Sequence, residues 1–182
     1  MAYAAVSIFL ALCVAGSGAT PTMDELKQAL STHDAIWIVN RTFNPRSGSD
    51  QHQCVYVEIG TLMEDRYDFT QHYWVAGQWH SNRLYAKLKD RQGTDGQPGF
   101  LVNQKEGQET GRLYILQYWD GNNRCGILKV ALGGEDHYEL HVWNEQVARV
   151  PRSCEEEYKK LTLGRKQFKL YSYDCANKRV AG

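Results

Sequence analysis

Residues 112–143 read RLYILQYWDGNNRCGILKVALGGEDHYELHVW and carry the plainest structural signal in the chain. Three runs rich in Val, Ile, Leu, Tyr and Trp are separated there by Asp120-Gly121-Asn122-Asn123 and by Gly133-Gly134. β-branched and aromatic residues favour strands, whereas short Asp, Asn and Gly segments favour tight turns. The stretch therefore predicts three consecutive antiparallel strands.

Five earlier runs have the same character, and turn-forming residues separate them as well. The expected strands are Ala35–Phe43, Gln53–Ile59, Tyr67–Trp74, Leu84–Leu88, Phe100–Asn103, Arg112–Trp119, Cys125–Ala131 and His137–Trp143. Eight evenly spaced strands joined by hairpins favour a closed up-and-down barrel, whose interior holds one small ligand. A β-sandwich is the alternative.

Helix signals flank this mostly β region. Thr22-x-x-Glu25 is a capping box and predicts a short helix through Leu30. Ser153-x-x-Glu156 is a second capping box and predicts a helix over Cys154–Leu163. Beyond it, alternation in Lys166–Cys175 predicts one more strand at or along the sheet edge.

The composition is that of one globular domain. The chain has 182 residues, 42% of them hydrophobic and 23% charged, and its 21 Lys and Arg balance its 21 Asp and Glu. Zero net charge provides no positive field for a polyanion, so we expect neither a nucleic acid nor a membrane as partner.

The first nineteen residues contain no charged side chain. Val6–Val14 is apolar but too short to span a bilayer, and Ser17-Gly18-Ala19 supplies the small residues that signal peptidase accepts. We therefore expect residues 1–19 to be a signal peptide and residues 20–182 to be a single secreted domain.

Four cysteines remain after that cleavage: Cys54, Cys125, Cys154 and Cys175. An even number in an oxidising compartment predicts two disulfides, with three pairings possible. Asn40 begins the Asn-Arg-Thr sequon, which predicts a glycosylation site in a secreted protein.

Sequence signatures of enzymes are missing. The chain has no Gly-x-Ser-x-Gly, Walker loop or His-Glu-x-x-His motif, so we expect a binding protein without catalytic residues, cofactor or metal. The most suggestive local pattern is His137, Glu139 and His141, which share one face of a strand. They form either the polar wall of a pocket, a two-histidine metal site, or a solvated outer face; the inward preference of apolar neighbours favours the last.

Aromatic residues supply further candidates. The chain has five Trp and eleven Tyr, and an aromatic cage beside a carboxylate is a common way to bind a cation. Trp37, Tyr114 and Trp119 lie in expected strands and are candidates for lining a pocket, together with the strand carboxylate Glu58.

Several of these features occur together in one known pattern. In chain order it comprises the N-terminal helix, Asp34-Ala35-Ile36-Trp37, Cys54, Cys125, Tyr138-Glu139-Leu140, Cys154 followed by Tyr158, and Cys175. In these residues the sequence resembles the tick salivary lipocalins of the histamine-binding type, across nearly the whole expected mature chain.

The resemblance implies a lipocalin barrel flanked by helices, with bridges Cys54–Cys175 and Cys125–Cys154. It implies a stoichiometric binder, not an enzyme, that sequesters small host mediators. We expect the chain to be a monomer. It also places Glu139 inside the cavity, against the preference stated above, with His141 beside it and with Asp34 and Trp37 as further ligand contacts.

The chain departs from the amine-binding pattern at three positions. Gly126 stands where an Asp follows the cysteine, His141 stands where an aromatic follows Glu-Leu, and Ile36 interrupts the Asp-Ala-Trp triplet. Besides a biogenic amine, two other classes of binding partner therefore stay open. One is an eicosanoid or other lipid whose carboxylate meets a histidine, Arg112 or Arg83; the other is a host protein bound at the surface.

Overall fold

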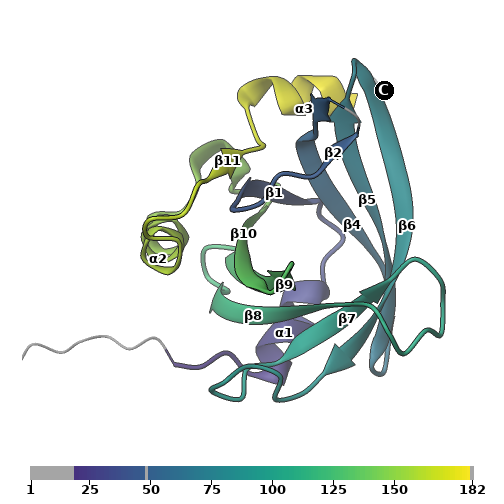
Figure 1. The fold of residues 1–182 in the computed structure, drawn as a ribbon, viewed down its shortest axis with the longest axis vertical. Helices are drawn as coiled ribbons and strands as arrows, with labels where there is room; N and C mark the ends of the chain where they lie inside the picture. The colour runs from purple at the N-terminus through teal and green to yellow at the C-terminus, as the bar shows by residue number, and fades with distance from the viewer. Residues whose placement is uncertain (1–18, 48, 181–182) are drawn as a thin grey trace, which may run out of the picture.

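The structure is a computed structural model that describes residues 19–47 and 49–180 (Figure 1). The expected signal peptide lies outside the described residues except for Ala19. Of the helices in the described ranges, none has the length and apolar character needed to cross a bilayer.

Eight long antiparallel strands form a closed barrel. They are β1 (Ile36–Arg41), β4 (Gln53–Met63), β5 (Arg66–Val75), β6 (Gln78–Lys89), β7 (Gly99–Asn103), β8 (Arg112–Asp120), β9 (Cys125–Leu132) and β10 (Glu135–Trp143). Each pairs with the next along the chain, and β10 returns to pair with β1. The predicted meander and barrel are therefore confirmed, and the β-sandwich alternative is wrong.

Tight turns explain why neighbouring strands pair in sequence order. Gly133 and Gly134 form the two-residue turn between β9 and β10, both with positive φ (61° and 86°). A turn with φ above zero at both central positions matches the twist of a hairpin and is easily adopted by glycine.

Three helices and three short strands complete the described chain. They are α1 (Met23–Leu30), β2 (Arg46–Ser47), β3 (Asp50–Gln51), α2 (Arg152–Leu161), β11 (Phe168–Lys169) and α3 (Tyr173–Val180), with a 3-10 turn at Val147–Arg149. Figure 1 shows α2, β11 and α3 following the outside of the barrel. Helix α1 instead contributes side chains to the barrel interior.

The barrel wall is buried on both faces where these outer elements cover it. Leu140 and Val142 on β10 pack outward against Tyr158 of α2, and both are fully buried. The bridge between Cys125 and Cys154 ties α2 to β9. The bridge between Cys54 and Cys175 ties α3 to β4 in the same way. Residues that follow the barrel in the chain therefore belong to the hydrophobic core on its outer side.

Both disulfides have the pairing that the family resemblance implies. Cys54 bonds to Cys175, and Cys125 bonds to Cys154. By chain entropy, a bridge closing about 120 residues stabilises the fold more than one closing about 30 residues.

The first capping box is confirmed. The Thr22 hydroxyl accepts the Glu25 N–H, and the Glu25 carboxylate accepts the Thr22 N–H at 2.8 Å. The second expected box is wrong, because α2 begins at Arg152 directly after Pro151. The Ser153 hydroxyl is then used elsewhere and donates to Asp120 at 2.6 Å.

The strand expected over Lys166–Cys175 is also largely wrong. Only Phe168–Lys169 pairs with β1, and Cys175 lies in α3. The chain leaves the sheet after the Leu170 N–H donates to the Val39 carbonyl. It then crosses the outer face of β4, where the bridge to Cys54 lies.

Candidate functional site

The barrel encloses a cavity of about 340 Å³. This volume lies toward the small end of the range for small-molecule sites, roughly 300–1,000 Å³. The lining is mostly aliphatic and aromatic and comprises Leu26, Ala29, Leu30, Ile36, Ile38, Val57, Ile59, Tyr67, Phe69, Gln71, Asn82, Leu84, Phe100, Val102, Asn103, Gln104, Arg112, Tyr114, Leu116, Trp119, Gly126, Leu128, Glu139, His141 and Trp143.

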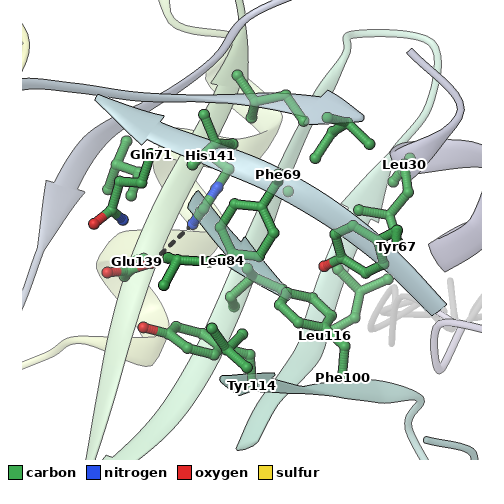
Figure 2. A pocket seen from close by; sticks show the side chains of 18 of the residues that line it. Leu30, Tyr67, Phe69, Gln71, Leu84, Phe100, Tyr114, Leu116, Glu139 and His141 are labelled. Atoms are coloured by element: carbon green, nitrogen blue, oxygen red, sulfur yellow. Dashed lines mark hydrogen bonds and ion pairs between the residues drawn. The ribbon is translucent and has the colours of Figure 1, made fainter. Parts of the chain in front are cut away.

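The cavity has one apolar end and one polar end. Figure 2 shows Leu30, Tyr67 and Phe100 at one end, and Glu139 and His141 at the other. Leu30 belongs to α1, so this helix builds part of the apolar wall. An elongated ligand with one polar group therefore has one orientation that matches both ends.

Glu139 is the only carboxylate in the cavity wall among the described residues. It is 4% exposed, and its Oε2 lies 3.0 Å from His141 Nε2. Because an ionised carboxylate only accepts hydrogen bonds, the imidazole Nε2–H donates to it. The pair presents a buried negative charge that one neighbouring side chain orients.

The charge of Glu139 acts on the titratable groups around it. Burial, and then the charge of Glu139, raises the pKa of the Tyr114 hydroxyl well above its usual range. Burial lowers the pKa of Arg41, while Glu139 acts in the opposite direction and favours the charged guanidinium. At neutral pH a neutral phenol in the cavity wall and a buried cation outside the lining therefore lie near the carboxylate.

The preference for a solvated Glu139 face is wrong. Tyr138, Leu140 and Val142 do face a hydrophobic core, as apolar residues should, but that core lies outside the barrel and includes residues of α2. Glu139 and His141 consequently face the interior. The residue pattern alone assumes one core per strand, whereas β10 borders two buried regions.

Four of the proposed ligand contacts lie together in the cavity wall: Glu139, His141, Tyr114 and Trp119. They come from β8 and β10. Tyr114 stacks on Phe100 with ring centroids 5.6 Å apart. The aromatic and carboxylate components of a cation site are thus present in one cavity.

Trp37 does not lie in the cavity wall. Its neighbours Ile36 and Ile38 line the cavity, so strand alternation points Trp37 outward. It is 1% exposed, and its Nε1–H donates to Asn144 Oδ1 at 2.9 Å. Trp37 therefore stabilises the outer core rather than a ligand.

Glu58 and Asp34 also lie outside the cavity lining. Glu58 faces the outside of β4, where Arg179 donates to it at 2.9 Å and His72 lies 3.3 Å away. Asp34 precedes β1, and its N–H donates to the Thr32 hydroxyl. Asn40, the expected glycosylation site, is half-buried within β1, and its glycosylation stays a prediction.

The two arginines considered for a lipid carboxylate lie in different places. Arg112 contributes to the cavity wall. Arg83 lies outside it and donates to Asp68 Oδ2 at 2.8 Å. Only Arg112 is therefore placed to meet an anionic group inside the cavity.

His137 does not join Glu139 and His141 in a common cluster. Its Nδ1 lies 3.1 Å from the Thr42 hydroxyl, and its ring packs against Phe43. In the described ranges no three His, Cys, Asp or Glu side chains come close enough to hold a metal ion.

Gly126, one of the three departures from the amine-binding pattern, has a packing role. A Cβ at this position would lie 3.1 Å from the Tyr118 carbonyl oxygen and 3.3 Å from Trp119 Cε3. Glycine in a strand commonly permits such a close approach. Trp119 thus packs against backbone at the place where the family pattern has an acidic residue.

Several cavity residues were not among the sequence candidates. Tyr67, Phe69 and Gln71 line the cavity at every second position of β5, and Asn82 is the Cα partner of Gln71. The sequence shows that these side chains of β5 share one face of the strand, but it does not show which face of the strand points into the barrel. Arg41 is not part of the lining, but a bulge in β1 makes it the direct partner of Glu139 in the strand register.

The fold and this cavity define a small-molecule-binding lipocalin. The profile of the family described as tick histamine binding protein matches residues 19–177. The chain belongs to this tick histamine binding protein family. A search of curated proteins finds no match.

Solved structures of lipocalins share the fold at low sequence identity. The serotonin complex of AM182 is 17% identical with a TM-score of 0.62, covering 82% of this chain and 91% of that chain. Japanin from Rhipicephalus appendiculatus bound to cholesterol is 13% identical, with a TM-score of 0.54 and coverages of 79% and 96%. The tryptamine complex of the amine binding protein of Rhodnius prolixus is 11% identical, with a TM-score of 0.50 and coverages of 90% and 94%.

Proposed function

We propose that this chain is a secreted, non-enzymatic lipocalin that sequesters a small host mediator, and that a biogenic amine such as histamine or serotonin is its ligand. The observation that carries the proposal is the buried Glu139 carboxylate in a cavity of about 340 Å³. A buried carboxylate attracts an ammonium far more strongly than an exposed one, because water does not screen the charges.

The rest of the cavity supports the same ligand class. Tyr114 and Trp119 provide aromatic surface, and His141 orients the carboxylate. The apolar end accommodates a ring. Members of the fold bind serotonin and tryptamine, each of which combines an ammonium with an aromatic ring.

Secretion is part of the proposal. Residues 1–19 have the pattern of a cleaved signal peptide, and both disulfides fit an oxidising compartment. We propose that the mature chain, residues 20–182, acts as a monomer outside the cell by stoichiometric binding.

A lipid mediator is the second candidate. The cavity has an extended apolar end, and Arg112 in its wall is able to meet a carboxylate. Japanin, which shares the fold, was solved bound to cholesterol. The small volume and the buried Glu139 both disfavour an anionic lipid relative to an amine.

Isothermal titration of the disulfide-intact mature protein tests the proposal, with histamine, serotonin and leukotriene as ligands. We expect submicromolar binding of an amine, which corresponds to about −8 kcal/mol or better. Binding of leukotriene without binding of either amine would indicate that the ligand is a lipid mediator. Absence of both signals would favour a host protein as partner.

A further inference from the structure

One amide side chain in the cavity wall has no hydrogen-bond partner within the protein. Gln71 follows Tyr67 and Phe69 on the face of β5 that lines the interior. Its side chain is half-buried, and neither its oxygen nor its nitrogen hydrogen-bonds to another of the described residues. A polar group that is partly shielded from water is costly to leave unpaired. The Gln71 amide is therefore suited to a polar group that enters the cavity.

The other amide side chains of the lining differ from Gln71. In the described part of the chain the lining contains four of them: Gln71, Asn82, Asn103 and Gln104. Asn103 already donates from Nδ2 to the Gln108 carbonyl at 3.1 Å. Asn82 and Gln104 are exposed, so water competes for their hydrogen bonds. Gln71 alone of the four combines partial shielding with unused hydrogen-bonding capacity.

Gln71 lies at the polar end of the cavity. Figure 2 shows it at the same end as Glu139 and His141, away from Leu30 and Phe100. Strands β5 and β10, which carry Gln71 and Glu139, are not neighbours in the barrel. No hydrogen bond joins the Gln71 amide to the Glu139 carboxylate among the residues described. Two polar groups from separate strands thus reach one end of the cavity without binding each other.

The Glu139 carboxylate also has acceptor capacity left. His141 Nε2 lies 3.0 Å from Oε2, and no side chain in the described ranges hydrogen-bonds to Oε1. Both oxygens of an ionised carboxylate accept hydrogen bonds, and so does an amide oxygen, whereas a primary ammonium has three N–H donors. Glu139 and Gln71 therefore offer acceptors for two donors of one ammonium.

We propose that Gln71 is a specificity-determining residue that accepts a second hydrogen bond from the ligand's ammonium, and so selects primary and secondary amines over tertiary amines. This inference rests on the proposed amine-binding function and narrows its ligand class. Charge alone does not make this distinction, because all three kinds of protonated amine carry one positive charge. A tertiary ammonium has a single N–H, which leaves either the carboxylate or the amide without its partner.

N-methylated ligands test the selection without any variant. Histamine and serotonin each have N-methyl and N,N-dimethyl derivatives that differ from the parent only at the amine nitrogen. Titration calorimetry of the disulfide-intact protein compares the series of the parent that binds more tightly. We expect the dimethyl derivative to bind at least about tenfold more weakly than the parent, the effect of one hydrogen bond to a charged group. The monomethyl derivative keeps two N–H donors and should bind within about threefold of the parent.

A variant then assigns the preference to the amide. Gln71→Met removes the amide and keeps an unbranched side chain of similar length. It should bring the affinities of the parent and the dimethyl derivative within about threefold of each other, mainly by weakening the parent. Gln53→Met is the matched control, because Gln53 is exposed on β4 and lies outside the lining. It should leave the ratio unchanged, and thermal melts check that both variants fold.

The outcomes separate this inference from the proposed function. Equal affinities for the parent and its dimethyl derivative in the natural protein would overturn the role of Gln71 while leaving amine binding intact. A full loss at the first methyl group, or a ratio that persists in Gln71→Met, would do the same, since crowding would then explain the preference. Failure of both histamine and serotonin to bind would overturn the proposed function and this inference with it.

Discussion

Replacing the buried carboxylate by an amide is the most direct perturbation of the site. Glu139→Gln preserves the size of the side chain and an oxygen that is able to accept from His141 Nε2, 3.0 Å away in the natural protein. It removes the negative charge that we propose binds the ammonium. The substitution therefore tests charge with little change of shape.

The expected magnitude follows from the burial of the group. A hydrogen bond to a charged partner contributes about 1.5–3 kcal/mol net. Glu139 is 4% exposed, so solvent screening is weak and the whole of this range applies. We expect amine affinity to fall about 10- to 150-fold, since each 1.4 kcal/mol is a factor of ten.

Titration calorimetry with histamine and serotonin measures the effect, and a thermal melt confirms that the variant folds. Glu58→Gln is a matched control, because it makes the same chemical change on the outside of the barrel, where Glu58 contacts Arg179 and His72. It should not alter amine affinity. Binding by Glu139→Gln within twofold of the natural protein would refute the role of the carboxylate.

Three further perturbations have defined outcomes. Gly126→Asp should lower the free energy of unfolding by about 1–3 kcal/mol in urea titrations, because a Cβ would crowd Trp119; unchanged stability would show that the strand adjusts freely. Serine at both Cys125 and Cys154 should cost about 3–4 kcal/mol by loop entropy, and a loss under 1 kcal/mol in the same assay would contradict this. Burial lowers the pKa of His52, so its protonation opposes folding as pH falls below about 6.5. His52→Gln should therefore flatten the decline of melting temperature between pH 7 and 5, and an identical slope would argue against it.

Local patterns predicted most of the elements correctly. All eight barrel strands form at the expected places, and α1 begins at its capping box. These signals are short-range, because strand propensity and turn chemistry act within a few residues. The signals failed after residue 166, where the bridge to Cys54 and packing on the barrel determine that Cys175 lies in a helix.

The direction of each side chain was harder to predict than the strand that carries it. The alternation in β10 correctly separates Glu139 from Leu140. However, β10 borders two buried regions, the cavity and the outer core, and its apolar residues lie in the outer core. The family resemblance supplied the right direction for Glu139. It did not do so for Trp37, which the structure places in the outer core.

The sequence by itself determined the strand order, the barrel class and the pool of polar residues from which a site is built. Tertiary structure decided which of them share the cavity, because α2 and α3 cover the barrel from outside and bury both faces of its wall. It also decided that Arg41 is the strand partner of Glu139, through a single extra residue in β1. A one-residue bulge reverses every side chain beyond it, and only pairing with a distant strand shows where it lies.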